Sequence, residues 1–206
     1  MSSVSSKKSS STRRTPQQPR SERSLATILE VTARLFAQDG YDATTMTRIA
    51  ALADISIGGL YHYFPDKESI GVALSAYYGV ELATAWQPLI SHAAERSLRE
   101  FVREFLEILM EFTKKYPAFA VLATARIKRQ DPARKQNLRL SIARAFQAKR
   151  SSLSDEDAML AARVTLQLTR TMVVLHAEAT EIQKPEIVRT FEDLLTHYLD
   201  RLLTQS

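Results

Sequence analysis

The residues of this chain that could do chemistry are suited to binding rather than to catalysis. The four histidines, His62, His92, His176 and His197, are far apart in the sequence, and there is no HExxH, GxSxG or glycine-rich phosphate loop. Cysteine is absent, which excludes a disulfide framework, thiolate catalysis and Cys-based zinc sites. We therefore expect no enzymatic activity, no bound metal and no cofactor.

One short stretch, Thr44 to Lys67 (TTMTRIAALADISIGGLYHYFPDK), concentrates residues that could read a DNA surface. Its two adjacent glycines, Gly58 and Gly59, would each cost a short helix about 1 kcal/mol relative to alanine. Close approach of the backbone to another surface would justify that cost. For Gly59 we favour close approach to DNA, whereas for Gly58 a tight helix crossing within the protein is an equal alternative.

Three helices are expected to position this stretch. Hydrophobic periodicity predicts them at 24–39, 44–53 and 56–63. Thr44 and Ser56 are the expected N-caps of the second and third helices. Gly40 lies where the first helix should end, and Pro65 prevents the third from continuing. Helices this short bury their apolar faces only against each other and a third helix, which predicts a helix-turn-helix domain.

The region contains, in order, Phe36-Ala37, Gly40-Tyr41, Ala43-Thr44-Thr45, Ile49-Ala50, Ser56, Gly58, Leu60-Tyr61-His62-Tyr63-Phe64-Pro65 and Lys67-Glu68. Together these residues resemble the N-terminal signature of TetR-family transcriptional regulators, over roughly the fifth of the chain from Ser24 to Ile70. Two positions depart from the family, which usually has Gly in place of Asp54 and often Lys in place of Ile57. Asp tolerates a left-handed backbone, so the turn is expected to form. The missing Lys bears on the operator sequence rather than on the mode of binding.

The resemblance and the helix positions together imply a set of DNA contacts. Phosphate contacts position a protein on DNA, and base contacts specify the sequence. The residues expected at phosphates are Thr44, Thr45, Ser56, Tyr61, His62 and Lys67. Ile57 and Gly59 are expected to face base edges. The implied partner is a double-stranded, palindromic DNA operator.

Residues 1–23 are rich in Ser, Lys, Arg, Pro and Gln and are predicted to form a disordered basic tail. The tail carries six basic residues against one acid, so its net charge of +5 equals that of the whole chain. Residues 24–67 have three basic residues against five acidic ones, a formal charge of −2. A basic arm that contacts phosphates or the minor groove would compensate for that deficit. A leader that serves only solubility is the alternative.

Beyond Pro65 the sequence shows long amphipathic helices and no strand-like alternation. The predicted helices span 67–86, 97–115, 117–130, 132–150 and 154–179, with a last helix from 185 onward. The expected fold is all-α, with a helix-turn-helix domain at 24–66 and a helical ligand-binding and dimerisation domain at 67–206. In TetR-like proteins such helices wall a ligand pocket, although aromatic stripes more often form plain core. The expected wall residues are Tyr78, Trp86, Phe105, Phe112, Phe119, Met172 and His176.

The last two predicted helices have the pattern of packing seams. The final helix has apolar residues at alternating steps of three and four, and the helix before it is apolar on more than one side. Paired with their copies across a two-fold axis, as in TetR-like proteins, the two helices would form a four-helix dimer interface. The expected interface residues are Leu168, Leu175, Val188, Phe191, Leu195, Tyr198 and Leu202. Without the resemblance, an intramolecular seam would be an equal interpretation.

The sequence thus predicts a homodimeric, DNA-binding transcriptional regulator that responds to a small apolar or amphipathic effector, as a repressor by resemblance to most of the family. The alternative is a helical small-molecule-binding or interaction protein of the same fold that has lost operator binding. Arg126 to Arg150 holds nine basic residues and one acid, which suggests a site for an anionic ligand or for flanking DNA, although a solvated face is favoured. No membrane span and no secretory signal are expected, so the predicted location is the cytoplasm.

Overall fold

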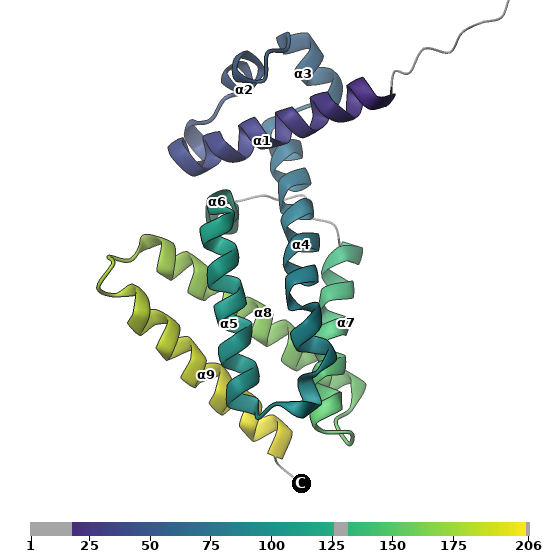
Figure 1. Cartoon of the computed structure of the whole chain (residues 1–206), viewed down its shortest axis with the longest axis vertical. Helices are drawn as coiled ribbons and strands as arrows, with labels where there is room; N and C mark the ends of the chain where they lie inside the picture. Colours follow the sequence, from purple (N-terminus) through teal and green to yellow (C-terminus); the bar gives the residue numbers. More distant parts are fainter. Residues whose placement is uncertain (1–17, 126–131, 205–206) are drawn as a thin grey trace, which may run out of the picture.

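The computed structural model describes residues 18–125 and 132–204, and every regular element in these two ranges is helical. The elements are α1 (Gln18–Ala43), α2 (Met46–Leu52), α3 (Ile57–Tyr63), α4 (Lys67–Ser91), the 3-10 turn η1 (Ala93–Glu95), α5 (Leu98–Lys115), α6 (Pro117–Thr124), α7 (Pro132–Lys149), α8 (Asp155–Glu178) and α9 (Lys184–Thr204). Figure 1 shows α1, α2 and α3 at one end of the molecule and α4 running from them into the helical body. The all-α fold predicted from the sequence is confirmed.

Local capping shapes the helix-turn-helix. The Ser56 hydroxyl accepts a hydrogen bond from the backbone N–H of Gly59 at 3.0 Å, as expected of an N-cap. Asp54, in the turn between α2 and α3, has φ 53°, the left-handed conformation that aspartate tolerates. Gly40 has φ 83° and breaks α1 near its end. The turn and the helix end therefore lie where the sequence predicts them.

Two helix starts differ from the prediction. Thr45, not Thr44, is the N-cap of α2, because the Thr45 hydroxyl accepts the hydrogen bond from the Arg48 N–H at 3.3 Å. α1 begins at Gln18, so the end of the predicted disordered tail is helical. Pro19 lies in the first turn of α1, where a backbone N–H would have no helical partner. Proline, which lacks this N–H, is therefore tolerated there. Residues 1–17, the rest of the predicted tail, lie outside the described residues.

The helical body is organised around α4 and α5. α4 continues through Pro88 to Ser91 instead of ending near Trp86, and α6 ends at Thr124, before the predicted end at 130. Trp86 is buried and stacks on Phe105 of α5, with ring centroids 4.1 Å apart. Its indole N–H donates a hydrogen bond to the Phe105 carbonyl at 3.0 Å. This pair fixes the spacing of α4 and α5 below the helix-turn-helix.

α8 is the one helix in the described ranges that is long and apolar enough to cross a membrane by length and composition. This differs from the sequence-based expectation that no segment would reach that level. α8 packs against α7 and α9, and it also contacts α6 and α5. Burial in the helical body accounts for part of its apolar content, because 39% of the apolar window is buried.

Candidate DNA-reading surface and effector cavity

α3 presents a surface that could enter the major groove. Leu60 is fully buried and anchors the helix to the core, whereas Ile57 and Tyr61 are 42% and 52% exposed. His62, which follows Tyr61, is exposed as well. The hydroxyl residues Thr45 and Ser56 are exposed at the starts of α2 and α3. Five of the eight predicted contact residues are thus exposed, on α3 or at the starts of α2 and α3.

The two glycines of α3 have different surroundings. A Cβ added at Gly58 would meet nothing within 4 Å, so no helix crossing inside the described chain requires a glycine there. A Cβ at Gly59 would lie 3.1 Å from the Ser56 hydroxyl oxygen, so this glycine has an intramolecular reason, the N-cap. Close approach to DNA is therefore no longer needed to explain Gly59, and it becomes the favoured explanation for Gly58.

Lys67 is not placed to contact a phosphate as predicted. Its ammonium donates hydrogen bonds to the carbonyls of Tyr41, Asp42 and Thr44, at 2.6, 3.1 and 2.8 Å. It also lies over the Tyr41 ring, 4.6 Å from the centroid. The three bonds use all three donors of the ammonium group. Lys67 thus holds the end of α1 against the start of α4.

Thr44 is a second correction among the predicted phosphate contacts. Its side chain is buried, with 1% exposure, and its hydroxyl donates a hydrogen bond to the Gly40 carbonyl at 2.8 Å. At Gly40 the backbone leaves the helical conformation and the chain turns from α1 toward α2. The Thr44 side chain lies on the inner side of this turn instead of at the surface. Thr44 therefore supports the corner between α1 and α2.

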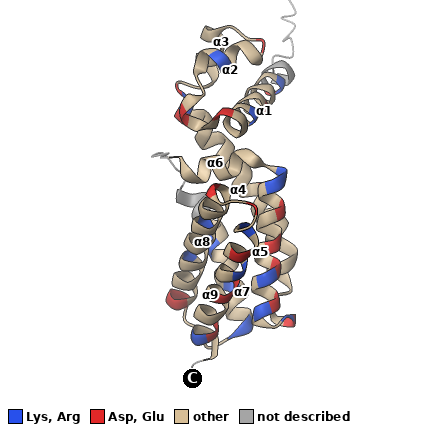
Figure 2. Cartoon of the chain, turned by 90° about the vertical axis from the view of Figure 1, so that its left-hand side faces the viewer, with Lys and Arg blue, Asp and Glu red and all other residues tan. Residues whose placement is uncertain are grey.

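Few cations remain free on the DNA-reading domain. Lys67 is occupied by carbonyls, and the Arg48 guanidinium lies 2.8 Å from the Asp39 carboxylate. α3 itself contains no lysine, arginine, aspartate or glutamate. Figure 2 accordingly shows most of the basic and acidic residues on the helical body and few on α2 and α3. The described α2 and α3 thus carry no unpaired lysine or arginine to offset the formal charge of −2 predicted for this domain, which makes basic residues N-terminal to it more important for DNA binding.

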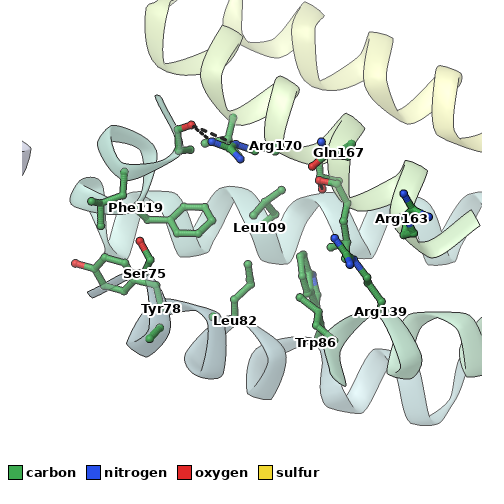
Figure 3. A pocket seen from close by; sticks show the side chains of 18 of the residues that line it. Ser75, Tyr78, Leu82, Trp86, Leu109, Phe119, Arg139, Arg163, Gln167 and Arg170 are labelled. Atoms are coloured by element: carbon green, nitrogen blue, oxygen red, sulfur yellow. Dashed lines mark hydrogen bonds between the residues drawn. The ribbon is translucent and has the colours of Figure 1, made fainter. Parts of the chain in front are cut away.

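A cavity of about 290 Å³ lies in the helical body, between α4, α5, α6, α7 and α8. Much of its apolar lining is formed by Tyr78, Leu82, Trp86, Leu109 and Phe119, which Figure 3 shows around the space. Burial raises the pKa of Tyr78 to about 12, so the phenol stays neutral and can donate a hydrogen bond. A cavity of this kind, largely apolar with a few convergent polar groups, is typical of small-molecule sites.

The predicted wall residues are divided by the structure. Tyr78, Trp86 and Phe119 line the cavity. Four others are not in its lining: Phe105, Phe112, Met172 and His176. Phe105 stacks on Trp86, and Phe112 packs its ring against those of Tyr78 and Phe119. Met172 is fully buried, and the pKa of His176 is lowered by burial and by nearby Lys184, which keeps its imidazole neutral.

Four polar residues of the lining were missed by sequence reasoning: Arg139, Arg163, Gln167 and Arg170. Arg139 belongs to the basic run from Arg126 to Arg150, which suggested an anion site. A solvated face was the favoured interpretation of that run. Arg163 and Arg170 stand on an apolar helix, where single arginines suggest nothing by themselves. Their convergence depends on how α7 packs against α8. The expected wall residues included no arginine, whereas the lining contains three.

α6 connects the cavity to the DNA-reading domain. Phe119, Leu122 and Ala123 of α6 line the cavity, and the helix also packs against α1. Arg170 of α8 donates two hydrogen bonds to the Ala123 carbonyl, from Nε at 3.2 Å and from Nη2 at 2.9 Å. These bonds satisfy a carbonyl at the C-terminal end of α6, where a cation is also favoured by the helix dipole. α8, α6 and α1 thus form a continuous chain of contacts.

The predicted dimer seam is partly core. Phe191 and Leu195 are 7% and 0% exposed within one chain, and Val188, Tyr198 and Leu202 pack against that core. α9 packs against α5 and α8, which buries the face that the periodicity identified. The remaining apolar surface lies on the outer face of the two helices, where Leu175 and Leu194 are 44% and 51% exposed. The intramolecular alternative therefore applies to Phe191 and Leu195.

The helix-turn-helix end, the linking helix α4 and the cavity-bearing body together have the arrangement of a DNA-binding regulator. Comparison with known families agrees with this class. Residues 28–74 match the model of the bacterial regulatory proteins of the tetR family, and residues 97–199 match the tetracyclin repressor-like C-terminal domain. The chain belongs to the TetR family of transcriptional regulators. The expectation of a transcriptional regulator instead of an enzyme is confirmed.

Curated relatives and solved structures are consistent with this membership. The chain is 33% identical over 79 residues to the repressor AcnR of Corynebacterium diphtheriae, covering 38% of each chain. It is 28% identical over 91 residues to the regulator RutR of Escherichia coli, covering 44% of this chain and 41% of RutR. The match thus spans less than half the length of these relatives.

Among solved structures, a TetR-family regulator from Streptomyces coelicolor superposes with a TM-score of 0.67 at 21% identity, covering 87% of this chain and 99% of that one. The repressor FadR of Thermus thermophilus, in complex with lauroyl-CoA, superposes with a TM-score of 0.62 at 22% identity, covering 88% and 96%. At this level of identity, the likeness shows the shared fold.

Proposed function

We propose that the protein is a dimeric repressor that leaves its operator when an effector occupies the cavity in the helical body. The observation that carries this proposal is the double position of α6, which lines the cavity and packs against α1. An effector that fits better when α6 is displaced would shift the population toward the displaced state. It can do so only by as much as its preference for that state.

In this proposal α3 enters the major groove. Ile57 and the backbone at Gly58 face base edges, because Ile57 is exposed and the space around Gly58 is open. Thr45, Ser56 and Tyr61 contact phosphates from the helix starts and the outer side of α3, with His62 beside them. Thr44 and Lys67 are left out, because both are bonded within the protein.

The proposed dimer pairs the outer faces of α8 and α9 with their copies. Along α8, Leu160, Val164, Leu168 and Leu175 recur at helical spacing and are exposed or half-buried, as is Leu194 on α9. An isologous contact of these faces would bury an apolar surface that one chain leaves in water. Two recognition helices must lie about 34–36 Å apart to read successive turns of the operator. Displacing α6, and with it α1, would change that spacing.

Repression and ligand control are supported by what the similar proteins are named. AcnR and FadR are named repressors, and the FadR structure contains lauroyl-CoA. A loss of about 1.4 kcal/mol in operator binding lowers affinity tenfold, so a modest effector preference is enough to release DNA.

A gel-shift titration against DNA upstream of the protein's own gene tests this proposal. We expect binding that competing unrelated DNA does not remove, with the stoichiometry of a dimer on a two-fold symmetric site. A matched fragment with one half-site scrambled serves as the control. Equal affinity for the operator and for unrelated DNA would contradict the proposal and favour a ligand-binding protein that has lost operator recognition.

A further inference from the structure

The cavity lining contains three arginines, Arg139, Arg163 and Arg170, and no acidic residue among the described residues that form it. We propose that the ligand is an amphipathic anion, whose carboxylate or phosphate head is held by Arg139 and Arg163 and whose apolar body fills the cavity. The proposal rests on the proposed function only in treating this ligand as the effector. The binding site itself can be tested without DNA.

The polar groups converge from two helices. Arg163, Gln167 and Arg170 are spaced by four and three residues on α8, so they share one face of that helix. Arg139 comes from α7 on the facing side, and Figure 3 shows it extending toward Gln167 beside Trp86. Arg170 is already bound to the Ala123 carbonyl. This leaves Arg139 and Arg163, with the Gln167 amide, to bind a head group.

The charges of Arg139 and Arg163 are not balanced within the part of the chain that the structure describes. No described carboxylate lies within ion-pair distance of either guanidinium, whereas Arg96, Arg99 and Arg189 on other faces each contact an acid. Arg139 and Arg163 carry like charges, which repel each other even though solvent screens part of the repulsion. An anion would neutralise this repulsion, and the guanidinium fork matches a carboxylate or phosphate in bidentate geometry.

The position of the polar groups also fixes the orientation of the ligand. Arg163 and Gln167 are exposed and Arg139 is half-buried, so the head would lie at the open rim. Leu82 and Trp86, which are 5% and 1% exposed, form the apolar interior for the body. A neutral molecule of the same shape would gain only the apolar contacts, and a cationic one would meet three like charges. The cavity of about 290 Å³ suits a single medium-length chain or a small ring system.

Calorimetric titration of the DNA-free protein with four probes of one chain length tests the head group: decanoate, decyl phosphate, decanol and decylamine. We expect both anions to bind at least about tenfold more tightly than decanol, and decylamine to bind more weakly still. The ratio of decanoate to decyl phosphate assigns the carboxylate or the phosphate as the better head. Decanol binding as tightly as the anions, or no anion binding at all, would overturn the proposal.

Variants locate the head group. Arg139→Gln and Arg163→Gln should each lower decanoate affinity about three- to tenfold while leaving decanol affinity unchanged, and Arg139→Lys should lose less than Arg139→Gln. Arg144→Gln is the matched control, because Arg144 is exposed on the same helix and does not line the cavity. If Arg144→Gln lowers the decanoate affinity as much as Arg139→Gln does, the anion is attracted by the general positive charge of α7 and the proposed site is refuted. If the protein binds anions through these arginines but does not bind the operator, the proposed function as a regulator is refuted and the anion site is not.

Discussion

The proposed DNA-reading surface lies mainly on one short helix, α3, whereas the cavity takes its lining from α4, α5, α6, α7 and α8. The first depends on caps and turns within a few residues, such as Ser56 with Gly59. The second depends on which faces of distant helices meet, such as Trp86 of α4 and Arg163 of α8. A substitution in the first region should therefore act on DNA binding with little effect on ligand, and one in the second should act on ligand first.

The largest separation of the two regions is expected from Gly58→Leu. A side chain at this open position should push α3 away from the groove and reduce operator affinity by more than about a hundredfold. Helix stability should not fall, because glycine is about 1 kcal/mol worse than alanine in a helix. Gel-shift titration and circular dichroism measure the two quantities.

Gly59→Leu provides the comparison for Gly58→Leu. Because a Cβ at Gly59 would press on the Ser56 hydroxyl, this variant should also lose thermal stability. Operator binding by Gly58→Leu at wild-type affinity would remove Gly58 from the interface.

Lys67→Met should destabilise the corner that joins the two regions. The ammonium makes three hydrogen bonds to backbone carbonyls, so its loss should cost about 2 kcal/mol of unfolding free energy. Chemical denaturation measures the change. Lys114→Met is the control, because Lys114 pairs with exposed Glu111 on the surface and its loss should cost less than about 0.5 kcal/mol. A flatter salt dependence of DNA binding without lost stability would restore Lys67 as a phosphate contact.

The basic residues before α1 should contribute to DNA binding and not to ligand binding. Deleting residues 1–16 removes Lys7, Lys8, Arg13 and Arg14 and leaves α1 complete. If these residues neutralise phosphates, the slope of log affinity against log salt should become less negative by up to about 3.6. Fluorescence anisotropy across a salt series measures it, and decanoate binding should not change. An unchanged slope would make this segment a leader without a role in DNA binding.

The sequence predicted the local features of the helix-turn-helix better than the features that depend on packing between distant helices. Gly40, Asp54 and Ser56 were placed correctly, because each acts through its own backbone conformation or a partner within three residues. The role of Lys67 was missed, because its three carbonyl partners lie 23 to 26 residues away and an exposed cation was assumed. The pairing of Arg139 with α8 depends on tertiary packing, which periodicity does not report.

The seam on α9 shows the limit of periodicity in another way. The spacing of Phe191 and Leu195 identified a buried face correctly, but a repeat of three and four residues is the same for a core and for a dimer interface. Only the packing of α9 on α5 and α8 distinguishes the two.

The smallest expected effect comes from Arg170→Met, which tests the connection between the regions. Losing both hydrogen bonds to the Ala123 carbonyl should loosen α6 and reduce operator affinity by about threefold. The effector should also change operator affinity by a smaller factor in this variant. Arg103→Met is the matched control, since Arg103 pairs with Glu107 on exposed α5 surface away from α6. Operator affinity that is the same in both variants would exclude the Arg170 bonds from transmission.

The most direct test of the account is reciprocal binding between the two regions. The amphiphile that binds most tightly in the titrations above is titrated calorimetrically into free protein and into the protein–operator complex. If occupancy of the cavity displaces α6 and α1, the operator must weaken ligand binding by the same factor by which the ligand weakens operator binding. We predict a difference of about tenfold in both directions. Equal ligand affinity in the free and DNA-bound states would contradict the account and leave a DNA-binding protein whose cavity does not control it.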